Sequence, residues 1–139
     1  MTIESTFTQE RSRMSNYFEP LQNAQFVVLT TYRRNGEAMP TTVWFAEEAG
    51  KVYMTTMQGI GKVKRLRANP QATLASSDRV GVIDGPAIEV RGRVLEPEEF
   101  EVAIAALEHK YGDMYRTMVS QMDATRPPNS RIFLEFVPA

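Results

Sequence analysis

The residues best suited to chemistry lie in a basic, glycine-containing segment near the middle of the chain. Gly59 and Gly61 precede Lys62, and Arg65 follows one helical turn later. Glycines let a ligand approach the backbone closely, and a helix N-terminus with a lysine beside it favours phosphate. Residues 49–77 contain five basic residues and no Asp or Glu. An anion site and an ordinary solvated basic helix both fit this pattern, which does not match the P-loop motif.

A second group of candidates follows the hairpin turn signal Asn35-Gly36. Thr41, Thr42, Val43 and Trp44 combine hydroxyls with an indole. On a barrel strand such residues could line a flat aromatic ligand through stacking and hydrogen bonds. The same residue types form strands well, so a structural role with Trp44 in the core is the alternative.

Two weaker candidates lie further along the chain. We expect His109, the only histidine, to be a solvated surface residue. Met114, Met118 and Met122 form a helical stripe with Tyr111 and Tyr115 nearby, which indicates core or subunit packing, or else an adaptable substrate wall or lid. No acid, base and nucleophile stand together, so an enzyme with this sequence would depend on a cofactor for its difficult chemistry.

The composition excludes several classes of site. The chain has 139 residues, no Cys and one His, which removes disulfides, thiolate nucleophiles and a metal site built from several histidines. A net charge of −1 argues against a protein built around nucleic-acid binding. No apolar run approaches the roughly 20 residues that span a bilayer, and the first residues lack the order of a signal peptide. We therefore expect a cytoplasmic protein without metal, membrane or nucleic-acid partners.

The elements that position these candidates can be read from hydrophobic periodicity. Hairpin-linked strands imply antiparallel pairing, so we expect a mainly β or α+β fold, a small antiparallel barrel with helices packed outside. One domain should cover residues 1–139. The expected elements are an N-terminal helix over about 8–24, a barrel over about 26–137 with strands at 26–32, 38–46, 52–56, 72–76, 87–95 and 132–136, a short helix at 61–69, and helices from 96 onward that are interrupted at Gly112.

The order of several motifs resembles the pyridoxamine 5′-phosphate oxidase-like split β-barrel superfamily, and within it the branch of deazaflavin (coenzyme F420)-dependent reductases. The most specific motif is the block from Gly61 to Pro70, which reads Gly-Lys-Val-Lys-Arg-Leu-Arg-Ala-Asn-Pro. The resemblance covers about residues 25–137. Weaker matching motifs lie at 29–32, 35–36, 42–45, 52–56, 78–79, 85–86, 90–92 and 110–112.

This resemblance implies a six-stranded antiparallel split β-barrel of the FMN-binding type with peripheral helices. It also implies a homodimer that binds a flavin-type cofactor in a groove at the dimer interface. Lys62 matches the phosphate-binding lysine that follows Gly61, and Arg65 lies where a second basic group would hold an acidic tail. Thr41, Thr42, Val43 and Trp44 match the strand beside the tricyclic ring, and Thr55 and Thr56 end the strand that leads into the phosphate loop.

The implied activity is that of an oxidoreductase that transfers a hydride between reduced F420 and a small organic acceptor. F420 carries a phosphate and a polyglutamate tail, so the surplus of basic residues favours it over FMN. An FMN-dependent oxidoreductase and a non-catalytic flavin or deazaflavin binder are the alternatives, together with a structural domain whose groove is empty. Two positions depart from the family pattern: Ile60 replaces an expected small hydroxyl residue, and Thr42 replaces an expected proline.

Overall fold

The computed structural model describes residues 17–139, so most of the helix expected over 8–24 lies outside the described residues. Of that expected helix, the described part contains only η1 (Glu19–Leu21), a single 3-10 turn. The remaining elements are β1 (Phe26–Tyr32), β2 (Ala38–Trp44), β3 (Ala46–Glu48), β4 (Lys51–Met57), α2 (Gly61–Ala68), β5 (Gln71–Ser77), β6 (Ile83–Val94), η2 (Pro97–Glu99), α3 (Phe100–Tyr111), α4 (Asp113–Asp123) and β7 (Arg131–Pro138).

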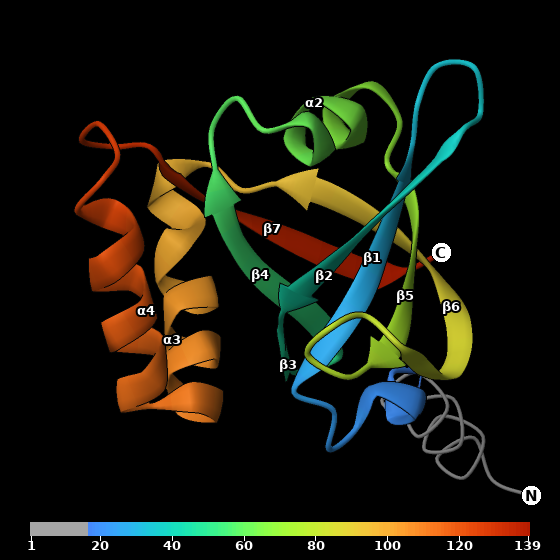
Figure 1. Ribbon diagram of the computed structural model, residues 1–139, viewed down its shortest axis with the longest axis horizontal. Helices are drawn as coiled ribbons and strands as arrows, with labels where there is room; N and C mark the ends of the chain where they lie inside the picture. Colours follow the sequence, from blue (N-terminus) through green and yellow to red (C-terminus); the bar gives the residue numbers. More distant parts are fainter. Residues whose placement is uncertain (1–16) are drawn as a thin grey trace, which may run out of the picture.

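The strands form one antiparallel sheet in the order β2-β1-β5-β6-β7-β4-β3. The expectation of six strands in a closed barrel is therefore wrong in two respects. The described residues form seven strands, and no ladder joins β2 to β3 at the two ends of the order. These end strands are consecutive in the chain and separated only by Phe45, so the sheet curls back on itself (Figure 1).

The break at Phe45 has a cause that lies far away in the sequence. The Phe45 N–H donates to the Tyr111 hydroxyl oxygen at 3.1 Å, and the Phe45 carbonyl lies 2.7 Å from the same hydroxyl. Lys110 Nζ donates to that carbonyl at 2.9 Å and to the Ala24 carbonyl at 2.7 Å. Because α3 thus satisfies both backbone groups of Phe45, the expected strand over 38–46 divides into β2 and β3.

Two hydrophobic cores lie on the two faces of the curled sheet. The first fills its interior, where Leu29, Leu74 and Phe136 are fully buried, and α2 contributes Leu66. The second lies between the outer face and the helices α3 and α4, which form a separate layer at the left of Figure 1. As expected for an amphipathic helix, Val63 and Leu66 of α2 are buried while Lys64 and Arg67 are exposed.

Local signals explain where the later helices begin and end. Glu96 and Glu99 form a capping box at η2, so these carboxylates stabilise the start of the helical segment. Gly112 separates α3 from α4 at φ +58°, a conformation that disfavours side chains. None of the helices in residues 17–139 has the length and apolar character needed to cross a membrane.

Candidate anion and cofactor site

The N-terminus of α2 follows a tight loop at the end of β4. Gly59 has φ +81°, and the Gln58 N–H donates to the Ser130 carbonyl at 2.8 Å. Ile60 is the N-cap residue and makes no side-chain capping bond. Among residues 17–139, the N–H groups of Gly61 and Lys62 have no backbone acceptor. Two donors at the positive end of the helix dipole are therefore available to a ligand.

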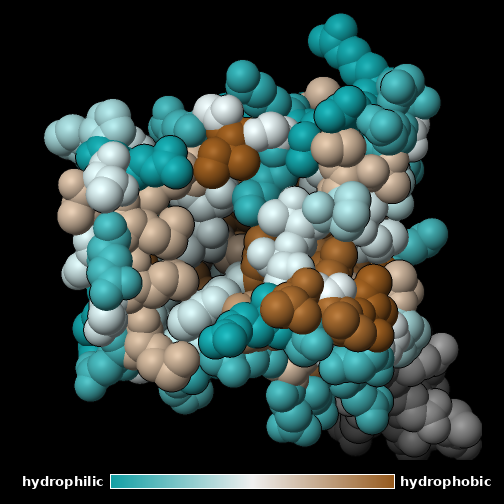
Figure 2. Space-filling model, viewed as in Figure 1, coloured by the Kyte–Doolittle hydropathy of each residue, from teal (hydrophilic) through white to brown (hydrophobic). Residues whose placement is uncertain are grey.

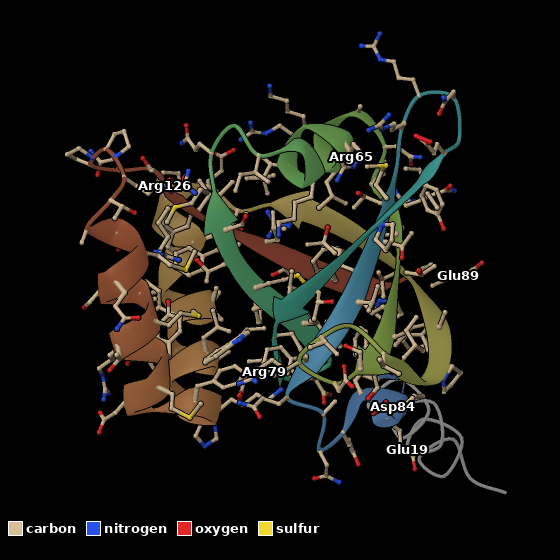
Figure 3. The ribbon with its side chains drawn as sticks, in the orientation of Figure 1. Glu19, Arg65, Arg79, Asp84, Glu89 and Arg126 are labelled. Atoms are coloured by element: carbon tan, nitrogen blue, oxygen red, sulfur yellow. The ribbon has the colours of Figure 1, made fainter. Side chains whose placement is uncertain are left out.

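Arg65 folds back over this helix start. Its Nε donates to Thr31 Oγ1 at 2.7 Å, and Thr31 is fully buried on β1. A Cβ added to Gly61 would lie 2.7 Å from Arg65 Nη1, so the guanidinium can occupy this position only because residue 61 is glycine. Figure 3 shows Arg65 at the end of the barrel that α2 covers.

Lys62 completes a positive corner, which we define as Gly61, Lys62 and Arg65. Burial lowers the pKa of Lys62, and the positive charge of Arg65 lowers it further. Within the described part of the chain, no carboxylate forms a salt bridge with Lys62 or Arg65. Two uncompensated cations beside two free amide donors match the chemistry of a phosphate dianion.

The β2 candidates occupy different surroundings. Val43 lies in the interior core, and a Cβ added to Gly81 would lie 2.6 Å from Thr42 Oγ1, so the β5–β6 loop covers this threonine. Thr41 is half-buried and pairs with Leu29. Since β2 is an edge strand, half of its backbone donors and acceptors face away from β1 and can meet a ligand.

Trp44 is engaged with the helical layer. Its ring lies 4.4 Å from that of Tyr111, centroid to centroid, and 5.9 Å from that of Phe26 in an edge contact. Trp44 pairs with Phe26, at the opposite end of β1 from Thr31. The structure therefore brings Gly61, Lys62 and Arg65 together but places Trp44 apart from them.

Thr55 and Thr56 lie near the end of β4, as expected, and face opposite ways. Thr56 is buried, at 4% exposure. The Thr55 hydroxyl donates to the Ile132 carbonyl at 3.2 Å and accepts from Arg131 Nη1 at 2.7 Å. Both residues thus belong to the strand that leads to the positive corner, but neither hydroxyl forms a described hydrogen bond with a residue of that corner.

Of the weaker candidates, His109 is solvated as expected, whereas the methionine stripe packs against the core only in part. His109 is 84% exposed at its side chain and lies 3.7 Å from a Glu48 carboxylate oxygen. Met118 packs against the second core and Met114 is exposed. Residues 17–139 contain no group of three or more His, Cys, Asp or Glu that could hold a metal.

Sequence reasoning missed one component of the site, Thr31. Its only signal is a hydroxyl residue two positions after Leu29, on the face of β1 that points into the barrel. A buried hydroxyl needs a partner, but the sequence does not reveal that Arg65 provides it.

The fold is therefore an antiparallel curled sheet with a basic helix across one end. A family model described as pyridoxamine 5′-phosphate oxidase (PNPOx_N) matches residues 15–138. The chain belongs to this family, which confirms the resemblance at the level of the superfamily. No curated protein sequence matches the chain.

Solved structures share the fold at low sequence identity. HutZ, the heme storage protein from Vibrio cholerae, aligns with TM-score 0.65 and 13% identity over 100% of this chain and 92% of its own. The conserved hypothetical protein Rv2991 from Mycobacterium tuberculosis aligns with TM-score 0.63 and 20% identity over 91% and 79%. General stress protein 26 from Bacillus anthracis aligns with TM-score 0.60 and 15% identity over 91% and 88%. Identities this low establish the fold alone.

Proposed function

We propose that the protein is an oxidoreductase that binds the phosphate of a flavin-type cofactor at the positive corner, with F420 as the first candidate and FMN as the alternative. One observation carries this proposal: the Arg65 guanidinium lies over a helix start with two free backbone N–H groups, Lys62 is close enough for the Arg65 charge to lower its pKa, and no described acid pairs with either cation. An uncompensated pair of like charges weakens a folded protein unless an anion joins it.

Each residue of the corner has a separate task in this proposal. Lys62 supplies a point charge, while Arg65, fixed by Thr31, supplies directed donors. The backbone of β2 over residues 41–44 offers hydrogen bonds to the polar edge of a flat ring. Thr55 and Thr56 pair with β7 near the end of β4, where the chain enters the loop before α2. When bound, the cofactor supplies hydride transfer to or from a small organic molecule.

The choice of F420 over FMN rests on the outer surface of α2. Lys64 and Arg67 are exposed on this helix and form no described salt bridge. They are in excess of what one phosphate requires, and an acidic tail would use them. FMN has no such tail, so it leaves these charges without a role.

A non-catalytic carrier of a flavin or deazaflavin is the second candidate. Ile60 favours it, because an N-cap without a hydroxyl donates nothing to a phosphate. Heme is named for HutZ and for a structural neighbour from Mycobacterium smegmatis. We do not extend heme binding to this chain, because its only histidine is 84% exposed at the side chain and lies against Glu48.

We also propose that the working form is a cytoplasmic homodimer. Val80, Val82 and Ile83 are exposed at 78%, 61% and 54% on the β5–β6 loop and the start of β6, and Figure 2 shows hydrophobic side chains gathered there. A second copy of the chain would cover this patch. Light scattering should give twice the mass of one chain, and Val82→Asp should shift the protein toward the monomer. A monomeric wild-type protein would contradict this proposal.

The decisive experiment is a titration of the purified protein with oxidised F420, FMN and riboflavin, followed by fluorescence. We expect F420 to bind most tightly and riboflavin, which lacks the phosphate, to bind at least tenfold more weakly than FMN. Tight binding of FMN alone would assign the protein to the FMN-dependent alternative. Binding of none of the three would refute a flavin-type site.

A further inference from the structure

A cavity lies on the opposite side of β4 from the interior core, against the helical layer. It has a volume of about 710 Å³ and is bounded by α3, α4 and the segment that leads into β7. Figure 1 shows this segment arching over the ends of the two helices. The size is typical of small-molecule sites. No residue of the positive corner lines it, and its apolar walls are Phe100, Ile104, Val119 and Phe133.

One polar group in this wall has no hydrogen-bond partner among residues 17–139. Tyr115 is only 4% exposed and lines the cavity, yet its hydroxyl makes no hydrogen bond to any described residue. Every fully enclosed side-chain N or O atom among residues 17–139 has a hydrogen-bond partner, so the unpartnered Tyr115 oxygen is not fully enclosed. The Tyr115 oxygen is therefore reached from the cavity, into which it can donate its proton.

The charged groups around the cavity neutralise one another. Arg131 Nε and Nη2 donate to Asp123 Oδ1 at 3.0 and 2.8 Å, and its Nη1 donates to Thr55. Arg116 lies 2.6 Å from an Asp113 carboxylate oxygen and 3.8 Å from one of Glu108. Each charged residue that the described part of the chain contributes to the cavity wall already has a salt-bridge partner, so a charged ligand would lose its hydration without full compensation.

We propose that this cavity is a binding site for an uncharged, largely apolar ring compound that carries a carbonyl oxygen. The rings contact Phe100, Ile104 and Phe133, and the carbonyl accepts a hydrogen bond from the Tyr115 hydroxyl. Burial raises the pKa of Tyr115, which keeps its proton in place as the donor. The site is separate from the flavin-type site proposed above and does not depend on it.

Three probes of matched shape test this assignment by calorimetric titration of the purified chain. They are 2-acetylnaphthalene, the hydrocarbon 2-isopropylnaphthalene and the anion 2-naphthoate. We expect saturable binding of the ketone, about fivefold weaker binding of the hydrocarbon, and the weakest binding of the anion. Tyr115→Phe should weaken the ketone about fivefold, the scale of one neutral hydrogen bond, and leave the hydrocarbon unchanged.

Two controls locate the site. Val119→Trp should fill the cavity and abolish binding of all probes, whereas Lys62→Ala, in the positive corner, should leave the binding of all three probes unchanged. Backbone amide shifts of the wild-type protein should change in α3 and α4, which tests the location even if Val119→Trp does not fold. The proposal is overturned if the ketone does not bind, if Tyr115→Phe weakens ketone and hydrocarbon equally, or if the shifts map to the exposed patch at Val82.

Discussion

Lys62 on α2 and Lys110 on α3 are two lysines with pKa values lowered by burial, in opposite situations. The ammonium of Lys110 donates to the carbonyls of Ala24 and Phe45 and lies 3.4 Å from the centroid of the Phe45 ring. Lys62 lies beside another cation, with free backbone donors at the start of its helix. Lys110 therefore holds the fold together, while Lys62 remains available to a ligand.

Two arginines repeat this contrast. Arg93 donates to both carboxylate oxygens of Glu99 at 3.0 and 2.7 Å and to Glu135 at 3.1 Å. The Arg93 guanidinium holds the pKa of Glu99 down at about 2. Arg65 has a single neutral partner, Thr31, which orients the guanidinium without cancelling its charge. In this fold the partners of a cation distinguish a structural role from a binding role.

The largest effect is expected on the free energy of unfolding, for variants of Tyr111, which contacts Phe45 as Lys110 does. Tyr111→Ala should lower the free energy of unfolding by about 3–5 kcal/mol, because it removes a buried ring packed on Trp44. Tyr111→Phe keeps the ring and should cost about 1–3 kcal/mol, since the buried Phe45 N–H loses its acceptor. Urea denaturation measures both. A Tyr111→Phe variant of normal stability that fails to bind cofactor would show that the contrast is wrong.

The next largest effect is expected on cofactor affinity, for a variant of Lys62. Lys62→Ala should weaken binding of the phosphate-bearing cofactor by about 1.5–3 kcal/mol, the scale of a hydrogen bond to a charged group. Stability should not fall, because Lys62 has no described partner to lose. With FMN, which has no acidic tail, as the ligand, Lys64→Ala on the same helix is the matched control and should cost less than about 1 kcal/mol. Equal losses in the two variants would indicate a diffuse basic surface in place of a site.

A smaller effect tests whether Arg65 is held in place. Thr31→Val preserves the shape of a buried residue but removes the acceptor of the Arg65 Nε–H. Binding of FMN should weaken by about 1 kcal/mol, whereas binding of riboflavin should not change. Thr30→Val, on the opposite face of β1, is the control. If Thr31→Val weakens FMN and riboflavin alike, its role is general stability.

A separate effect is a dependence of stability on pH. Burial lowers the pKa of Lys110 to about 8, against 10.5 for the ordinary group. Between these values the unfolded chain binds more protons than the folded one, so the free energy of unfolding should rise from pH 8 toward pH 10. The raised pKa values of Tyr53 and Tyr111, about 12, oppose this trend only above pH 10. Lys110→Met should reduce the rise and leave the part that the lowered pKa of Lys62 contributes, and an unchanged profile in this variant would assign the rise to other groups.

Several elements could be predicted because their signals are local. Strand β1 occupies the expected residues, α2 ends at Ala68 before Asn69-Pro70, and the glycine at 112 separates two helices. Gly61, Lys62 and Arg65 lie together on α2 for the same reason, since they are close in sequence, while their role as an anion site stays a prediction. Strand β6 begins at Ile83, earlier than expected, because Ser77 of β5 pairs with it across an irregularity in register.

The remaining features depend on contacts between distant residues. The division at Phe45 requires Lys110 and Tyr111, and the orientation of Arg65 requires Thr31. The cavity at Tyr115 exists because α3, α4 and the segment before β7 meet without filling the space between them. Periodicity reports which face of an element is buried, and it carries no information about which group will meet it there.

By itself, the sequence determined the antiparallel β character, the basic helix with its glycine, and the absence of cysteine chemistry. These follow from residue type and short spacing, which act within one element. Only the tertiary structure decided that no carboxylate among residues 17–139 would pair with Lys62 and that Lys110 would have two carbonyl partners. The physical reason is that solvation and pairing of a charge depend on what the fold brings within a few ångströms of it.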